Sequence, residues 1–230
     1  MWKQLLGLLK KESLCEEAFK ESLVMLRESE KMFNDSVASL WKEGVNDIDI
    51  YARDRQINRF ERKVRRLIAT HLAVSASPDV TGALVLTAIV IDIERIGDYT
   101  KNIVELAGAH PSTFDGGELE DEIRDIQTTV KRLFRDLGPA LEGSDVDKAR
   151  QIIGDHQIIA ARVEDHVHDL IRGKVLSENS GEAVTAAIYL RYLKRVSAHL
   201  KNVATSIVNP YYRIGFREKN EKKQEAPESE

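Results

Sequence analysis

Residues 84–107 read LVLTAIVIDIERIGDYTKNIVELA, and residues 184–207 read VTAAIYLRYLKRVSAHLKNVATSI. The two stretches share their apolar positions and several polar ones, such as Arg95 with Arg195. The carboxylates of the first stretch are missing from the second. Self-similarity at a fixed period is the signature of a repeated structural unit. We therefore interpret the chain as two homologous halves that share a fold and differ in their charged surface.

The repeat extends upstream of these stretches, where Asp54 and Ile57 match Asp155 and Ile158. Such in-phase matches over several segments predict a duplication that covers most of the chain. The expected parts are an N-terminal amphipathic segment, a first repeat, a second and degenerate repeat, and a largely disordered C-terminal tail. Their predicted boundaries are residues 1–11, 12–110, 111–210 and 211–230.

The spacing of apolar residues predicts an all-α protein. Apolar residues recur every three or four positions over long stretches, and the five prolines mostly lie where helices should begin or end. Short connections between long helices favour antiparallel neighbours, so we expect two tandem homologous three-helix bundles. The predicted helices cover residues 12–42, 47–74, 79–109, 119–141, 145–176 and 181–208.

Composition narrows the class of protein. The net charge of -4 leaves no basic excess with which to neutralise phosphates, which excludes a general nucleic-acid binder. The chain has a single cysteine, Cys15, and no long uncharged apolar run. Both features predict a reducing, cytoplasmic setting without a membrane-spanning segment.

Oxygen-bearing side chains form two columns on neighbouring helices of the first half, Asp54, Asn58 and Glu61 on the second helix and Glu94, Asp98 and Asn102 on the third. Side chains three or four residues apart are neighbours on a helix. If the two helices pack side by side, the columns converge on a site for a hard cation such as magnesium, manganese, calcium or iron. An ordinary solvated helix face has the same pattern, so that interpretation stays open.

The string ERIGDYTKNI at residues 94–103, preceded by DRQINRFE at residues 54–61, resembles the PhoU family of phosphate-uptake regulators. The resemblance extends from about residue 12 to residue 208 and implies two tandem three-helix bundles. It also implies a cytoplasmic accessory protein rather than an enzyme. Such proteins restrain phosphate import and signalling through contacts with the ATPase subunit of a phosphate ABC transporter and with a phosphate-sensing histidine kinase.

The resemblance further implies a metal centre on paired acidic motifs, with iron among the ions, and the oxygen ligands also suit manganese or magnesium. Carried over by position, its ligands are Asp54, Glu94 and Asp98, with Asn58, Glu61 and Asn102 as further candidates.

The second half departs from the family pattern, because Lys194 and Ala198 stand where Glu94 and Asp98 would be repeated. We therefore predict one metal site, in the first half, and expect Lys194 to serve as a counter-ion to Asp155.

The N-terminus, MWKQLLGLLKK, has an apolar stripe of Trp2, Leu5, Leu6 and Leu9 beside basic residues. This pattern is typical of a helix at a membrane surface or in a partner groove. Packing against its own bundle or against a second copy gives the same pattern.

Other functions remain open at this stage. One alternative is an accessory partner of a sodium-phosphate cotransporter or another carrier, and a second is a metal-binding protein. A carboxylate-bridged metal enzyme is disfavoured because the Glu-x-x-His pairs of di-iron bundles are absent from the sequence. We expect a homodimer.

Overall fold

The computed structural model describes residues 13–43 and 49–218, and over these ranges the protein is all-α, without a strand. The predicted N-terminal stripe of Trp2, Leu5, Leu6 and Leu9 lies outside the described residues, as does most of the predicted tail. The long helices are α2 (Leu14–Leu40), α3 (Ile50–Val74), α4 (Val80–Ala109), α5 (Glu120–Gly143), α6 (Val146–Ile171) and α7 (Ser180–Val208). Two short 3-10 helices, Gly117–Leu119 and Tyr211–Arg213, precede α5 and follow α7.

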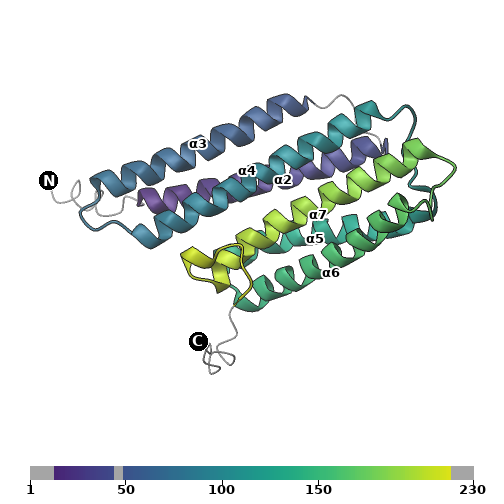
Figure 1. The fold of residues 1–230 in the computed structure, drawn as a ribbon. Helices are drawn as coiled ribbons and strands as arrows, with labels where there is room; N and C mark the ends of the chain where they lie inside the picture. Colours follow the sequence, from purple (N-terminus) through teal and green to yellow (C-terminus); the bar gives the residue numbers. More distant parts are fainter. Residues whose placement is uncertain (1–12, 44–48, 219–230) are drawn as a thin grey trace, which may run out of the picture.

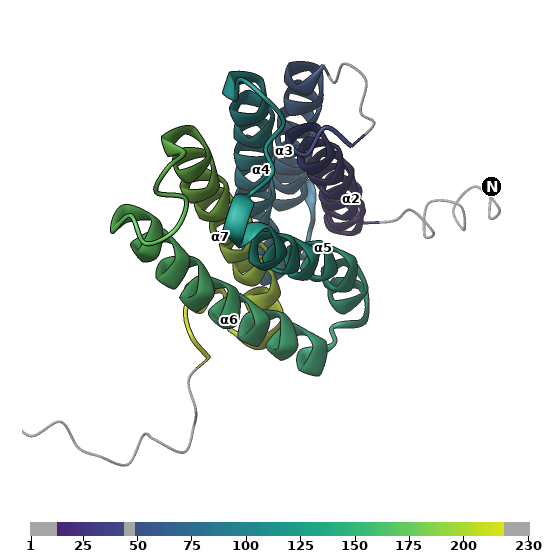
Figure 2. The same cartoon turned by 90° about the vertical axis from the view of Figure 1, so that its right-hand side faces the viewer.

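The helices form two three-helix bundles that lie side by side, as Figures 1 and 2 show. Helices α2, α3 and α4 pack together in the first bundle, and α5, α6 and α7 in the second. The bundles join where α4 packs along α7 and where α2 meets α5. This arrangement confirms the predicted fold class.

Polar side chains fix where the helices begin. Ser13 and Glu16 form a reciprocal capping box at the start of α2, in which the Ser13 hydroxyl accepts from the Glu16 N–H. Asp49, Asp79 and Asp145 each accept a backbone N–H in the first turn of the following helix. These side chains satisfy donors that the helix leaves unpaired.

The helix ends match the prediction except at α6, which ends at Ile171 rather than near residue 176. Gly173 adopts a φ of 63° and Leu176 a φ of 51°, so the chain leaves the right-handed helical region there. Glycine permits this backbone without strain, and periodicity does not reveal it.

The two bundles share one apolar core. The Trp41 indole N–H and the Tyr189 hydroxyl both donate to the Gln127 side-chain oxygen, each at 2.8 Å. Phe33 of α2 stacks near Phe134 of α5, with ring centroids 5.2 Å apart. Neither half therefore completes its own interior.

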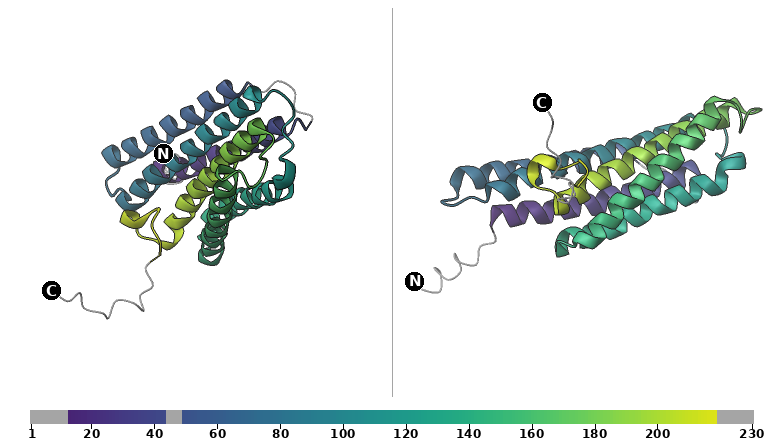
Figure 3. Two further views of the ribbon diagram at one scale, coloured as in Figure 1. Left: turned by 45° about the vertical axis from the view of Figure 1, so that its right-hand side comes forward. Right: turned by 60° about the horizontal axis from the view of Figure 1, so that its bottom comes forward.

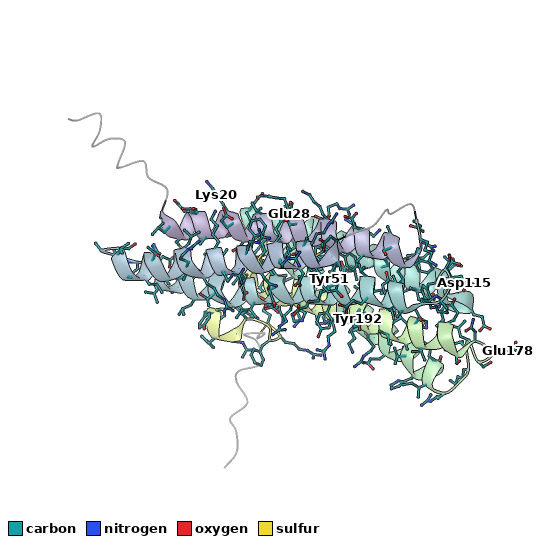
Figure 4. The ribbon with its side chains drawn as sticks, turned by 90° about the horizontal axis from the view of Figure 1, so that it is seen from above. Lys20, Glu28, Tyr51, Asp115, Glu178 and Tyr192 are labelled. Carbon is teal, nitrogen blue, oxygen red and sulfur yellow. The ribbon has the colours of Figure 1, made fainter. Side chains whose placement is uncertain are left out.

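A polar seam also crosses between the bundles, from α4 to α7. Asp92 accepts from His199 Nδ1 at 2.7 Å and from Asn202 at 2.9 Å. Tyr99 stacks on His199 and lies near Tyr192, whose position on the ribbon is labelled in Figure 4. Among the described helices, none is long and apolar enough to cross a membrane.

Candidate functional site

The predicted metal ligands lie along a groove between α3 and α4, and Gly97 determines how closely these helices approach. Gly97 is buried, and a Cβ built on it would lie 3.2 Å from the Ile57 Cγ2 atom of α3. This distance is tighter than ordinary van der Waals contact. The glycine of the ERIGD string therefore lets α3 and α4 come close enough for their polar columns to interact.

Lys101 joins the two columns. Its Nζ lies 3.2 Å from Asp54 Oδ1 on α3 and 3.3 Å from Asp98 Oδ1 on α4. Burial opposes the charge of this ammonium, but the Asp54 and Asp98 carboxylates outweigh burial and raise the pKa of Lys101. The Lys101 ammonium thus lies between Asp54 and Asp98, two of the predicted metal ligands.

The Glu94 carboxylate has no such close cation to offset its burial. Burial, followed by the charge of Asp98, raises the pKa of the Glu94 carboxyl, and Glu61 and Asp54 add to the effect. Arg95 lies 3.6 Å from Glu94 and opposes the shift, but its closer contact is with Asp98, at 3.0 Å. An excess of negative charge therefore remains at this end of the groove.

The remaining candidates have different roles. The Asn58 amide donates to Asp54 Oδ2 at 3.3 Å, and Glu61 pairs with Arg65 at 2.7 Å. Asn102 is half-buried on α4. The predicted columns of α3 and α4 are thus neighbours. Within the α3 column, Asn58 donates a hydrogen bond to Asp54, and Glu61 forms an ion pair with Arg65.

The donor set suits a hard cation in its chemistry, because carboxylate and amide oxygens are the ligands such ions prefer. In the present arrangement the Lys101 ammonium lies where Asp54 and Asp98 could share an ion. Within residues 13–43 and 49–218, no three Asp, Glu, His or Cys side chains converge closely enough to hold a metal ion. Loading the groove therefore requires Lys101 to move, and the metal site stays a prediction.

The expected pairing of Lys194 with Asp155 in the second half is wrong. Asp155 pairs instead with Arg132 of α5 at 3.1 Å, and the Lys194 ammonium bonds Glu164 of α6. The arginine side chain of α5, the first helix of this bundle, reaches Asp155, and Glu164 supplies a carboxylate for Lys194.

Sequence reasoning missed the role of Lys101. The signal was present, because Lys101 follows Asp98 by three residues and so lies on the same side of α4. What the spacing could not show is that this ammonium also reaches across to α3.

Fold and groove together define an all-α protein of two repeated three-helix bundles with an acidic groove in the first repeat. Residues 23–107, which include that groove, match the family model of the PhoU domain. This match confirms the resemblance to that family inferred from the ERIGD string.

Similar proteins align with this chain over most of its length, which includes both repeats. A Pseudomonas putida protein described as a phosphate-specific transport system accessory protein PhoU homolog is 27% identical over 184 residues, which cover 78% of this chain and 72% of that protein. The crystal structure of PhoU from Pseudomonas aeruginosa has a TM-score of 0.71 at 23% identity and covers 85% of this chain and 95% of its own. The phosphate transport system regulatory protein PhoU from Streptococcus pneumoniae has a TM-score of 0.71 at 16% identity, covering 84% and 93%. These structures share the fold of both bundles.

Proposed function

We propose that this protein is a cytoplasmic, non-enzymatic regulator of phosphate uptake and phosphate signalling. It acts by contact with a phosphate transporter component, a phosphate-sensing histidine kinase, or both. The transporter component is the ATPase subunit of an ABC transporter or a carrier such as a sodium-phosphate cotransporter. The observation that carries the proposal is the PhoU domain over residues 23–107, supported by the P. putida relative described as a transport accessory protein.

The exposed side of α3 is a candidate contact surface. Arg59, Arg62 and Arg66 are exposed and recur every three or four residues, so they form a basic row on a rigid helix. A row of this kind favours an acidic partner surface and contributes mainly to the rate and specificity of association.

The test is affinity purification of the protein from phosphate-replete cells, followed by identification of what is retained. We expect a phosphate transporter component or a sensor kinase to be recovered with the wild-type protein. Reversal of Arg59, Arg62 and Arg66 to glutamate should reduce this recovery. A matched control reverses Lys148, Arg150 and Arg172 at the two ends of α6, the counterpart of α3, and should leave it unchanged. Recovery of neither a transporter nor a kinase with the wild-type protein would contradict the proposal.

A second candidate function is metal binding by the α3–α4 groove, and the uncompensated charge around Glu94 supports it. A divalent or trivalent ion such as iron, manganese or magnesium would neutralise this charge. Its proposed ligands are Asp54, Glu94 and Asp98, with Asn58, Glu61 and Asn102 as further donors. The ion competes with Lys101, whose ammonium contacts two of these carboxylates.

Equilibrium dialysis with elemental analysis tests the metal proposal. Lys101→Met removes the competing ammonium and should increase the retained metal, whereas Asp98→Asn should reduce it. Asp155→Asn, at the position of the second repeat that matches Asp54, serves as the control and should have no effect. Equal metal content in all four proteins would rule out a site in this groove.

A further inference from the structure

The second repeat has a separate cavity between α6 and α7, the pair of helices that corresponds to α3 and α4 of the first repeat. After α7 the chain turns back beside that helix, as the yellow segment in Figure 3 shows. The turn is held where the Gly215 N–H donates to Thr205 Oγ1 at 2.7 Å. A cavity of about 260 Å³ lies between this segment and the two helices. Its lining residues are Ile153, His156, Gln157, Ala160, Lys201, Gly215, Phe216 and Arg217.

The charge in this cavity is positive. Lys201 and Arg217 line it, and none of its described lining residues carries a carboxylate. The Lys201 ammonium donates to the Gly215 carbonyl at 2.8 Å, which is a neutral partner. Burial lowers the pKa of Lys201 in spite of the more distant Asp92. The ammonium is thus partly desolvated without direct contact to an anion, which is unfavourable unless a ligand of opposite charge completes the site.

His156 adds a second polar group with a defined proton arrangement. The Ser197 hydroxyl donates to the Lys194 carbonyl at 2.9 Å, so its oxygen is free to accept from His156 Nδ1–H, also at 2.9 Å. Burial, followed by the charges of Lys201 and Lys194, lowers the pKa of His156 to about 4. The ring is therefore neutral at physiological pH, and its Nε2 is a hydrogen-bond acceptor.

Comparison of the two repeats shows that matching positions between the second and third helices differ in charge. Lys101 has Asp98 beside it, whereas its counterpart Lys201 has Ala198 at the matching position. Gly97, which allows close helix packing in the first repeat, is replaced by Ser197, whose hydroxyl positions His156. The same lysine position of the repeat thus contacts carboxylates in the first half and lines a cavity without carboxylates in the second.

We propose that this cavity binds a small tetrahedral oxyanion that carries a proton, with hydrogen phosphate as its best ligand. Lys201 and Arg217 provide positive charge, and Gln157 provides amide donors. Neutral His156 Nε2 accepts the proton of the ligand, which fully ionised sulfate cannot offer. This inference rests on the cavity and its charges and is independent of the regulatory function proposed above.

The groups that face His156 predict how selectivity changes with pH. Lys194 and Lys201 approach it from α7, and Arg217 lines the same cavity from the C-terminal segment. Asp155, its neighbour on α6, is engaged by Arg132. As the pH falls toward the pKa of His156, Nε2 becomes protonated and turns into a donor. The preference for phosphate over sulfate should then decrease.

Isothermal titration calorimetry on the full chain tests the proposal, with sodium phosphate or sodium sulfate added at constant ionic strength. At pH 7.5 we expect one saturable phosphate site and at least about tenfold weaker sulfate binding, since sulfate would leave the partly buried His156 Nε2 acceptor without a donor. Lys201→Gln should weaken phosphate binding by about tenfold or more, because it removes a charge-assisted hydrogen bond. Lys148→Gln on α6 is the control and should bind as the wild type does.

Three results would overturn the proposal: no saturable phosphate binding, equal loss in both variants, or heats that follow ionic strength alone. Circular dichroism checks that the Lys201→Gln protein is folded. If it is not, the His156 ring-proton resonance of the wild-type protein is followed by NMR instead. The resonance should shift with phosphate along a saturation curve, and a resonance unmoved by phosphate would exclude the site.

Discussion

Glu94 and Asp98 lie one turn apart on α4, but their surroundings give them opposite effects on stability. Asp98 contacts Lys101 and Arg95, whereas Glu94 has a raised pKa because of burial and its acidic neighbours. In metal-free buffer at pH 7, Glu94→Gln should raise the free energy of unfolding by about 0.5 kcal/mol, and Asp98→Asn should lower it by about 1 kcal/mol. Chemical denaturation of both variants measures the difference. Equal destabilisation by the two would contradict this charge distribution.

The pH dependence of the Glu94→Gln effect follows from the same pKa. A carboxyl whose pKa is raised by folding favours the folded state below its ordinary pKa, and this contribution is lost as pH rises through the folded value. The gain from Glu94→Gln should therefore be present at pH 7 and absent near pH 4. A gain that stayed constant across this range would point to a packing effect.

The sequence predicted which helix faces carry the oxygen ligands, because a 3.6-residue period fixes the side of a helix on which each residue lies. It could not predict that Lys101 bridges Asp54 and Asp98, or that Arg132 reaches Asp155. Those contacts depend on how far long side chains extend between helices, which one-dimensional spacing does not specify. For the same reason the expected Lys194–Asp155 pair was wrong.

At the scale of the helices, Gly97 controls the separation of α3 and α4. Gly97→Val adds a branched side chain where even a Cβ would lie 3.2 Å from Ile57, so it should destabilise the protein by about 2 kcal/mol. It should also weaken the Asp54–Lys101–Asp98 contact by moving α3 outward. Thermal unfolding monitored by circular dichroism checks the first effect.

Gly108→Ala is the matched control on the same helix, because a Cβ at Gly108 has open space. It should stabilise the protein, by up to about 0.5 kcal/mol, through the better helix propensity of alanine. If Gly97→Val were tolerated as well as Gly108→Ala, the close approach of α3 and α4 would not be required for folding.

At the scale of the whole molecule, the two repeats should unfold together because they share buried polar contacts. Gln127→Ala leaves both the Trp41 indole and the Tyr189 hydroxyl without their acceptor and should cost about 3 kcal/mol. Thermal transitions followed by circular dichroism and by tryptophan fluorescence should still coincide. The control, exposed Gln151→Ala, should remain within about 0.5 kcal/mol of the wild type. Two separate transitions in the wild type would show that the repeats are independent domains.

The duplication and the six helices could be predicted from the sequence, since apolar periodicity and matching positions are local signals. The shared core could not, because Trp41, Gln127 and Tyr189 meet across long sequence separations. A pattern shows which face of each helix is buried but not whether the neighbour that covers it belongs to the same repeat.

Lys101 has a consequence for how the protein can be handled and how it responds to its surroundings. Because the ammonium is covalently tethered, its effective concentration at Asp54 and Asp98 is unaffected by dilution, dialysis or chelators. The groove of the first bundle therefore holds a positive charge even in a buffer without metal ions. A dissolved cation must displace this ammonium, so the apparent dissociation constant for the cation should be higher than it would be without the lysine.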